Sequence, residues 1–185
     1  MVADVSGKGL PAALFASAIK FYVAALESTD HTLDETLSMV NEGLFQDCAP
    51  NLFCTLFAAS FDHETKVLQF ASAGHNKMFL KKGNEVQELS AREGLPLGVI
   101  EGAKYSLESV KIDSGDVLFL YTDGCSELFA PDGEMYGIDR LVTFLKTSGA
   151  NGANAMNEDL HRELSAFRGE VEAPDDQTTL LVKFS

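Results

Sequence analysis

The sequence predicts an α+β fold in which pairs of helices flank antiparallel sheet. Apolar residues recur at helical spacing in two segments near the N-terminus, change to strand-like spacing from Phe53, and return to helical spacing from Ile138. A last strand-like segment covers residues 178–184. A helix pair, a run of strands, a second helix pair and a final strand are typical of helical layers that cover sheet.

Length and composition indicate a single domain that spans residues 1–185. The 185 residues are 45% hydrophobic, which is enough for a substantial core. Fourteen basic and 28 acidic residues give a net charge of −14, so neither nucleic acid nor an anionic membrane surface is expected as a partner. Cys48, Cys54 and Cys125 lack C-x-x-C spacing, and we therefore expect reduced thiols in a cytoplasmic protein.

The first helical pattern covers residues 10–26. Its predicted apolar face consists of Leu10, Leu14, Ala18, Phe21 and Ala25. We interpret it as a buried helix, because the stretch is too short and too charged for a membrane span. A second helix is predicted from Leu33 to Cys48, with Thr32 and Glu35 as a capping box at its start. The short link makes the two helices antiparallel neighbours.

Strand-like segments then follow one another with turns between them. They cover residues 53–61, 66–73, 78–81, 85–89, 105–112 and 116–122. The first four predict a meander of hairpins in an antiparallel sheet. Two helices are predicted next, at residues 138–147 and 153–167, and Gly169 ends the second.

Three aspartates, Asp4, Asp123 and Asp175, each lie in a short polar turn directly beside an apolar segment. Asp123-Gly124 alone would be an ordinary turn signal. Carboxylates gathered from distant parts of a chain repel one another unless a cation neutralises them, and magnesium and manganese prefer oxygen ligands. The three turns together therefore favour a metal site.

Several short segments carry a resemblance to a known family. They are Asp4-Val5-Ser6-Gly7, Thr55-Leu56-Phe57 with Asp62, Ala73-Gly74-His75-Asn76, Gly94-Leu95-Pro96-Leu97-Gly98, Tyr121-Thr122-Asp123-Gly124 and Asp175-Asp176. In order and spacing they resemble the SpoIIE/RsbU branch of the PPM metal-dependent serine/threonine protein phosphatases. The resemblance implies a four-layer α-β-β-α sandwich of two antiparallel sheets flanked by helix pairs.

The resemblance also implies a metal centre and an activity. Two divalent cations, manganese or magnesium, would be held by Asp4, the backbone carbonyl of Val5, Asp123 and Asp175. They would activate a water molecule, so that no side chain acts as the catalytic group. The expected reaction is hydrolysis of phosphoserine or phosphothreonine on a regulatory protein, an anti-sigma factor antagonist of the STAS type in a bacterial partner-switching pathway. An upstream sensor or receiver domain is the expected partner within the full-length protein.

One departure from the family concerns the N-terminus. Family members carry a Gly-Gly-Asp strand and most of a second strand upstream of the turn that begins here at Asp4, whereas only Met1-Val2-Ala3 precede it. We therefore expect an N-terminally incomplete domain that lacks one family aspartate. The alternative is a catalytically impaired, phosphatase-like protein-interaction module.

Four further residues have both a structural and a functional interpretation. Asp176 either orients metal-bound water or caps its own turn. Gly124 is expected next to the metal ligands or on the substrate side of the site. His75 either faces the substrate or belongs to a polar hairpin turn. Ser6 is expected to shape the turn after Asp4 and not to act as a nucleophile, since no histidine lies near it in the sequence.

Overall fold

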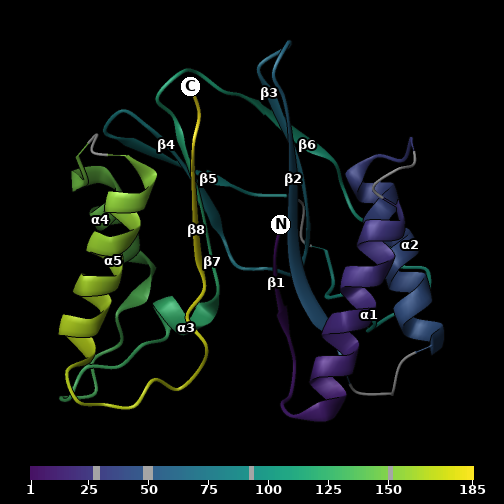
Figure 1. The fold of residues 1–185 in the computed structure, drawn as a ribbon, viewed down its shortest axis with the longest axis horizontal. Helices are drawn as coiled ribbons and strands as arrows, with labels where there is room; N and C mark the ends of the chain where they lie inside the picture. Colours follow the sequence, from purple (N-terminus) through teal and green to yellow (C-terminus); the bar gives the residue numbers. More distant parts are fainter. Residues whose placement is uncertain (27–29, 48–51, 92–93, 150–151) are drawn as a thin grey trace. The chain divides into compact units, whose positions relative to one another are not determined.

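The computed structural model describes residues 1–26, 30–47, 52–91, 94–149 and 152–185. The chain forms two compact units, the first from residues 1–75 and 90–111 and the second from residues 76–89 and 112–185. Each unit contains a four-stranded antiparallel sheet and a pair of long helices, and the second unit also contains a short helix (Figure 1). The predicted α+β fold with two antiparallel sheets is confirmed. The single domain stays a prediction.

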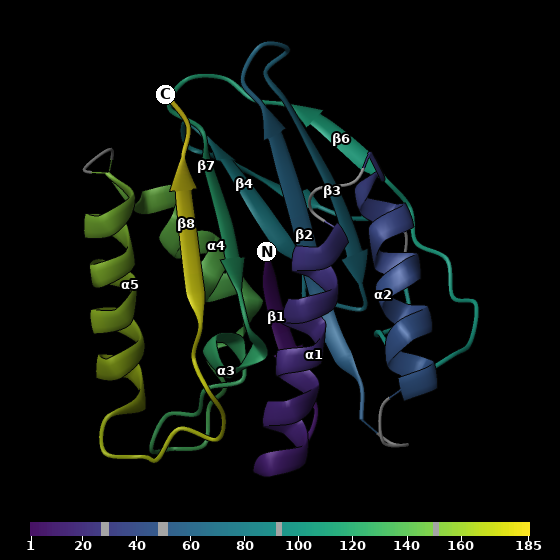
Figure 2. The same cartoon turned by 45° about the vertical axis from the view of Figure 1, so that its right-hand side comes forward.

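The sheet of the first unit has the strand order β1-β2-β3-β6. Its strands are β1 (Val2–Val5), β2 (Cys54–Asp62), β3 (Val67–Ala73) and β6 (Glu108–Lys111). Helix α2 (Leu33–Asp47) packs on β2 and β3, and α1 (Leu10–Leu26) contacts α2 and β1 (Figures 1 and 2). The core between helices and sheet is apolar and fully buried at its centre, and its residues include Phe15, Ile19, Leu37, Val40, Leu44 and Leu56.

The apolar face predicted for α1 is wrong. Leu10, Leu14 and Phe21 are 71%, 62% and 70% exposed, while the fully buried residues of this helix are Phe15 and Ile19. The helix is apolar nearly all round, so the spacing of its apolar residues does not identify the packed side. The expectation of a buried helix is also wrong, since 11% of the stretch 9–26 is buried.

By length and composition, residues 9–26 do meet the criterion for a membrane-spanning helix. This corrects the expectation that the stretch is too short and too charged. Core helices of soluble proteins and N-terminal signal sequences meet the same criterion.

Helix α2 begins as its sequence predicts. The backbone N–H of Thr32 donates to Glu35 Oε2 at 3.0 Å, which is the glutamate half of the capping box. Along the helix, Gly43 lies against Tyr22 of α1, where a Cβ atom would come 2.6 Å from the ring carbon Cζ. Only glycine lets the two helices approach this closely. Cys48, the predicted last residue of the helix, lies outside the described residues.

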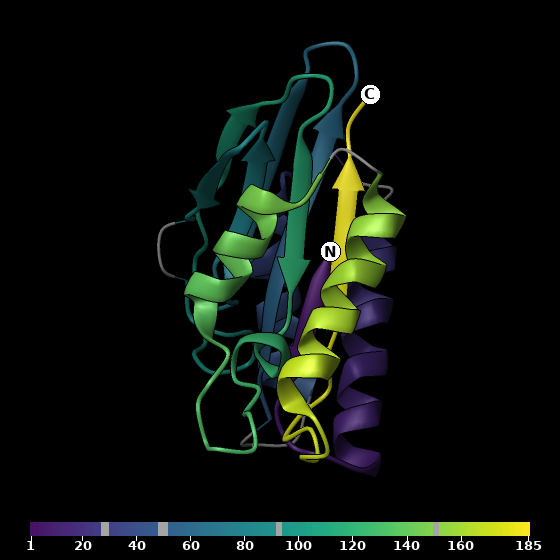
Figure 3. The same ribbon diagram turned by 90° about the vertical axis from the view of Figure 1, so that its left-hand side faces the viewer.

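The sheet of the second unit has the strand order β5-β4-β7-β8. Its strands are β4 (Met78–Lys82), β5 (Glu85–Leu89), β7 (Val117–Tyr121) and β8 (Thr179–Lys183). The one-turn helix α3 (Asp123–Ser126) follows β7, and the long helices are α4 (Gly137–Thr147) and α5 (Ala153–Arg168). Helix α5 runs along β8, as Figure 3 shows. All five residues of β7 are buried, which makes this strand the centre of the unit.

The predicted meander of four strands is wrong at its middle turn. β2 pairs with β3 and β4 pairs with β5, but β3 and β4 belong to different sheets. Residues 74–76 therefore connect two sheets, as do residues 112–116 between β6 and β7. The two long helices of the second unit lie within one residue of their predicted bounds, and Gly169 ends α5 as predicted.

Candidate metal centre

Asp123 stands where the most buried strand of the second unit ends. β7 finishes at Tyr121, Thr122 follows in extended conformation, and Asp123 opens α3. The Asp123 carbonyl accepts hydrogen bonds from the Glu127 backbone N–H at 2.7 Å and from Ser126 Oγ at 3.3 Å. The predicted turn is thus a short helix, and it holds the aspartate at the end of a rigid strand.

Thr122 joins the Asp123 segment to the segment of Asp175 and Asp176. Its backbone N–H donates to the carbonyl of Thr178 at 3.0 Å. Its hydroxyl donates to the carbonyl of Asp176 at 3.1 Å and accepts from the backbone N–H of Thr178 at 3.0 Å. A single buried threonine therefore fixes both segments through three hydrogen bonds.

Gly124 lets the Asp123 segment approach the backbone of Asp175 and Asp176 closely. A Cβ atom on it would lie 2.3 Å from the Asp176 carbonyl oxygen and 3.2 Å from that of Asp175. Backbone oxygens cannot rotate away from such a contact, as a flexible side chain could. Gly124 thus has a steric role in this segment. Its role toward the metal ligands or the substrate stays a prediction.

The two aspartates of this unit are brought together. A carboxylate oxygen of Asp123 and one of Asp175 lie within 4.8 Å of each other. Asp123 Oδ1 is buried and has no hydrogen-bond partner among the described residues. Asp175 Oδ1 accepts from the backbone N–H of Asp176 at 2.7 Å, which orients an otherwise exposed carboxylate. A buried carboxylate oxygen without a donor beside a second carboxylate fits an oxygen-liganded divalent cation.

Nucleophilic side chains beside Asp123 are held protonated. Burial, and next the charge of Asp123, raise the pKa of the Cys125 thiol to about 12. Burial likewise raises the pKa of Tyr121. Neither group is an anion at neutral pH, so neither is a ready nucleophile.

Asp4 lies in the first unit and belongs to a strand, not to a turn as predicted. It is the third residue of β1, an edge strand, where it is half-buried and paired opposite Thr55. Val5 is the last residue of the strand, opposite Cys54. The polar turn begins one residue later, at Ser6.

Ser6 has the structural role that its position predicts. Its backbone N–H donates to the Phe53 carbonyl and its hydroxyl accepts from the Phe53 N–H, both at 2.9 Å. Gly7 and Gly9 then have φ angles of +83° and +77°, which residues with a side chain rarely adopt. The chain thereby turns from β1 into α1.

His75 contacts β2 through its side chain, within the first unit. Its Nδ1 is 2.8 Å from the hydroxyl of Thr55, the strand partner of Asp4, and its backbone N–H donates to Ser72 Oγ at 3.3 Å. Its neighbour Gly74 allows Pro96 to pack closely, since a Cβ atom would lie 2.8 Å from the proline ring. The Ala-Gly-His-Asn and Gly-Leu-Pro-Leu-Gly motifs thus pack on each other, and a substrate-side role for His75 stays a prediction.

Sequence reasoning missed the part played by Thr122. It was assigned to the end of a strand, and the pattern around it gave no reason to expect its side chain to bind two backbone groups. No local signal could have found it, because the two bonds of the hydroxyl join residues 54 and 56 positions apart in the chain. Asp176 is a predicted site residue, and the structure shows two hydrogen bonds of its backbone. Its carbonyl accepts from the Thr122 hydroxyl, and its N–H donates to Asp175 Oδ1.

Comparison with known proteins decides the family. The family model described as Stage II sporulation protein E (SpoIIE) matches residues 1–185. The chain belongs to the SpoIIE family. Phosphoserine phosphatase RsbU of Bacillus subtilis (strain 168) is 28% identical over 184 residues, which cover 98% of this chain and 54% of RsbU. The chain therefore spans about half the length of this curated relative.

Solved structures show the fold of this SpoIIE family member. The PP2C phosphatase domain of SpoIIE from Bacillus subtilis, solved with a fragment of its regulatory domain, matches with a TM-score of 0.83 and 20% identity, over 98% of this chain and 52% of that one. RsbX in complex with magnesium matches with a TM-score of 0.69 and 20% identity, over 99% of this chain and 79% of that one. The chain thus has the fold of PP2C phosphatases, as the sequence resemblance predicted.

Proposed function

We propose that this chain is the catalytic region of a metal-dependent phosphatase that hydrolyses phosphoserine or phosphothreonine on a regulatory protein. The observation that carries the proposal is the buried Oδ1 of Asp123, which lacks a hydrogen-bond donor among the described residues and stands beside Asp175. Membership of the SpoIIE family, and the likeness to a protein named phosphoserine phosphatase, support the same reaction.

The proposed metal ligands are those that the resemblance to the family implies. Asp4, Asp123 and Asp175 would contribute carboxylate oxygens, and Val5 would contribute its backbone carbonyl oxygen. All are hard oxygen donors, which suits manganese or magnesium. The matching structure of RsbX was solved in complex with magnesium, which supports this choice of metal.

Bound divalent cations would lower the pKa of a water molecule and neutralise charge on the phosphoryl oxygens. The chain's own residues prepare the site for that chemistry. Asp123 offers a buried oxygen that no protein donor satisfies among the described residues, and the Asp176 N–H orients the carboxylate of Asp175. The protonated Cys125 thiol does not compete as a nucleophile, because its pKa is raised to about 12.

The proposed substrate is a phosphorylated anti-sigma factor antagonist of the STAS type, and the proposed compartment is the cytoplasm. The likeness of nearly the whole chain to phosphoserine phosphatase RsbU supports a phosphoserine substrate, and the STAS-type partner is what the sequence resemblance implies. The free thiols of Cys54 and Cys125, both buried, are compatible with a reducing compartment. An upstream sensor or receiver domain would complete the signalling protein.

The test measures hydrolysis of a small aryl phosphate and of a phosphoserine peptide, with and without manganese. The proteins are this chain, a chain extended upstream by the Gly-Gly-Asp strand expected from the family, and the Asp123→Asn variant of each. Asp30→Asn changes an exposed aspartate and is the matched control. We expect manganese-dependent turnover that Asp123→Asn lowers by on the order of 100-fold or more, since it removes a ligand charge.

Binding is measured separately from turnover. Manganese should raise the unfolding temperature of the parent protein and of Asp30→Asn but not that of Asp123→Asn, because a ligand that binds only the folded state stabilises it. Turnover in the extended chain alone would identify this chain as an incomplete enzyme. Absence of turnover in both chains would reject the proposal and favour a protein-interaction module.

A further inference from the structure

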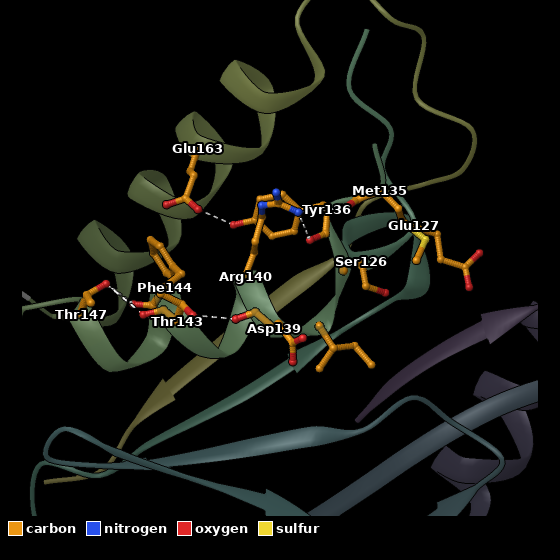
Figure 4. A pocket seen from close by; sticks show the side chains of 12 residues that line it. Ser126, Glu127, Met135, Tyr136, Asp139, Arg140, Thr143, Phe144, Thr147 and Glu163 are labelled. Carbon is orange, nitrogen blue, oxygen red and sulfur yellow. Dashed lines mark hydrogen bonds between the residues drawn. The ribbon is translucent and has the colours of Figure 1, made fainter. Parts of the chain in front are cut away.

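We propose that a cavity beside α3 is a docking site for a segment of the phosphoprotein substrate that carries an apolar side chain next to a lysine or arginine. This inference rests on the proposed function and names a property of its substrate. The cavity lies within the second unit and has a volume of about 830 Å³. Figure 4 shows the side chains that line it.

The cavity begins one helical turn from the candidate metal ligand Asp123. Ser126 and Glu127, which form part of its wall, are the residues whose hydroxyl and backbone N–H bond the Asp123 carbonyl. Helix α4 supplies most of the remaining lining. A segment bound here would thus contact the two residues that bond the backbone carbonyl of Asp123.

The cavity is preformed, because hydrogen bonds and ring contacts fix its inner wall. The hydroxyl of the buried Tyr136 donates to Glu163 Oε1 at 2.5 Å, and its ring packs edge-on against Phe167. Arg140 Nη1 donates to the carbonyls of Met135 and Tyr136, each at 3.0 Å. A wall fixed in this way costs a ligand little conformational entropy on binding.

The charge of the cavity is unbalanced. Its one lining cation, Arg140, is already committed to Glu134 at 2.8 Å and to two carbonyls. Glu127 and Asp139 are exposed and form no side-chain hydrogen bond or ion pair with any described residue. In Figure 4 both carboxylates point away from the Arg140 guanidinium. Two uncompensated carboxylates beside one cavity favour a cationic ligand.

The mouth of the cavity is apolar. Met135 and Ile138 line it and are 48% and 39% exposed, and Phe129, bridged to Met135, is 41% exposed. The hairpin that carries Phe129 and Met135 is held by the Ala130 N–H to Glu134 carbonyl bond at 2.8 Å. Large apolar side chains held at the surface beside acidic groups are typical of protein-recognition sites.

These observations favour a peptide segment of the substrate over a small molecule. The apolar mouth matches an aliphatic side chain, and the two carboxylates match a neighbouring lysine or arginine. Asp139 also lies in the first turn of α4, where an acidic residue stabilises a helix through its dipole. Stabilising the helix would not change which peptide is preferred. The peptide preference therefore separates this structural role of Asp139 from recognition of a cationic side chain.

The experiment compares phosphoserine peptides in which a Leu-Lys pair is moved stepwise along either side of the phosphoserine. Matched peptides carry Leu-Glu or Ala-Lys at the same places. The readout is kcat/KM in manganese for the chain that is active on the aryl phosphate. We expect at least one position at which Leu-Lys exceeds Leu-Glu by about fivefold or more, the effect of a favourable charge pair near a surface.

Four variants, three that change charge and one that removes an apolar side chain, test the assignment through peptide ratios, which do not depend on overall activity. Glu127→Gln and Asp139→Asn should each lower the Lys-over-Glu ratio, and Asp139→Lys should invert it. Ile138→Ala should lower the Leu-over-Ala ratio. Glu158→Gln, at an exposed position on α5 outside the cavity lining, is the control and should change neither ratio.

The outcomes separate the two proposals. Aryl phosphate turnover without any preference among the peptides would overturn the docking site and leave the proposed function standing. A preference that survives all three charge variants would also overturn it. Absence of aryl phosphate turnover would reject the proposed function, and the docking site with it.

Discussion

The two segments that carry the candidate ligands are held in place by different means. In the second unit, Asp123 follows a fully buried strand, and Thr122 and Gly124 on either side of it fix its distance from residues 175–178. In the first unit, Asp4 lies on an edge strand and is held by pairing with Thr55. Two glycines with positive φ then lead directly into α1.

This difference shows where the site is rigid and where it can be adjusted. The pair Asp123 and Asp175 is fixed by bonds and by steric exclusion within one unit, so its geometry is set by folding. The strand of Asp4 is continuous with the helix pair α1 and α2. We therefore expect a shift of these helices to alter the position of Asp4, and so to couple a signal to metal binding.

The largest effect is expected for Gly124→Ala, which adds a methyl group where the Asp123 segment contacts the backbone of Asp175 and Asp176. The new Cβ would stand 2.3 Å from a backbone oxygen, so the Asp123 and Asp175 segments must separate. We expect a loss of about 1–3 kcal/mol in the free energy of unfolding and loss of most manganese-dependent hydrolysis. Urea unfolding and aryl phosphate turnover measure the two effects. The control is Gly133→Asn, at a positive-φ position with open space around it. Wild-type turnover in Gly124→Ala would show that the close approach is dispensable.

A smaller effect is expected for Thr122→Val. Valine preserves the shape but removes the hydroxyl, leaving the Thr178 N–H and the Asp176 carbonyl each without this partner. The expected loss is about 0.5–1.5 kcal/mol in unfolding free energy, with weaker manganese binding measured by titration calorimetry. Thr122→Ser retains the hydroxyl and should retain most of the manganese affinity. Equal affinities for valine and serine variants would mean that the hydroxyl does not position the aspartates.

The helix pair provides a test of the adjustable segment. Gly43→Ala places a methyl group 2.6 Å from the Tyr22 ring and should push α1 away from α2. Alanine favours a helix by about 1 kcal/mol over glycine, so a net loss of stability reports the clash. We expect manganese affinity to fall about threefold if the helix position is coupled to Asp4. The double variant Gly43→Ala with Tyr22→Leu removes the ring and should restore it. Unchanged affinity in Gly43→Ala would argue against coupling through these helices.

The parts that the sequence predicted well are those with local causes. Gly169 and the capping box at Thr32 set helix ends within one residue. Asp123 and Asp175 were expected to meet because aspartates in several polar turns of a family pattern need a common cation, and the two do lie together. These signals are short-range or chemical, and they do not depend on long-range packing.

The parts that failed depend on long-range packing. Periodicity could not choose the packed side of α1, because this helix presents apolar residues on both sides and its partner, the α2 surface, is not visible in the sequence. Nor could it assign β3 and β4 to different sheets, since a turn such as residues 74–76 suits a hairpin and a crossing equally well. The Thr122 hydrogen bonds span 54 and 56 residues of chain and were likewise hidden.

The smallest effect is expected for Ser6→Ala. The substitution removes the hydroxyl that accepts the Phe53 N–H, but Phe53 is 40% exposed, so water can replace the lost acceptor. We expect a loss of about 0.5 kcal/mol in the free energy of unfolding and a manganese affinity close to that of the parent. Ser17→Ala removes an exposed hydroxyl bond within α1 and is the control. An equal loss of manganese affinity in Ser6→Ala and Thr122→Val would mean that side-chain hydrogen bonds fix the end of β1 as firmly as they fix the Asp123 segment. The contrast between a fixed Asp123 segment and an adjustable Asp4 segment would then be wrong.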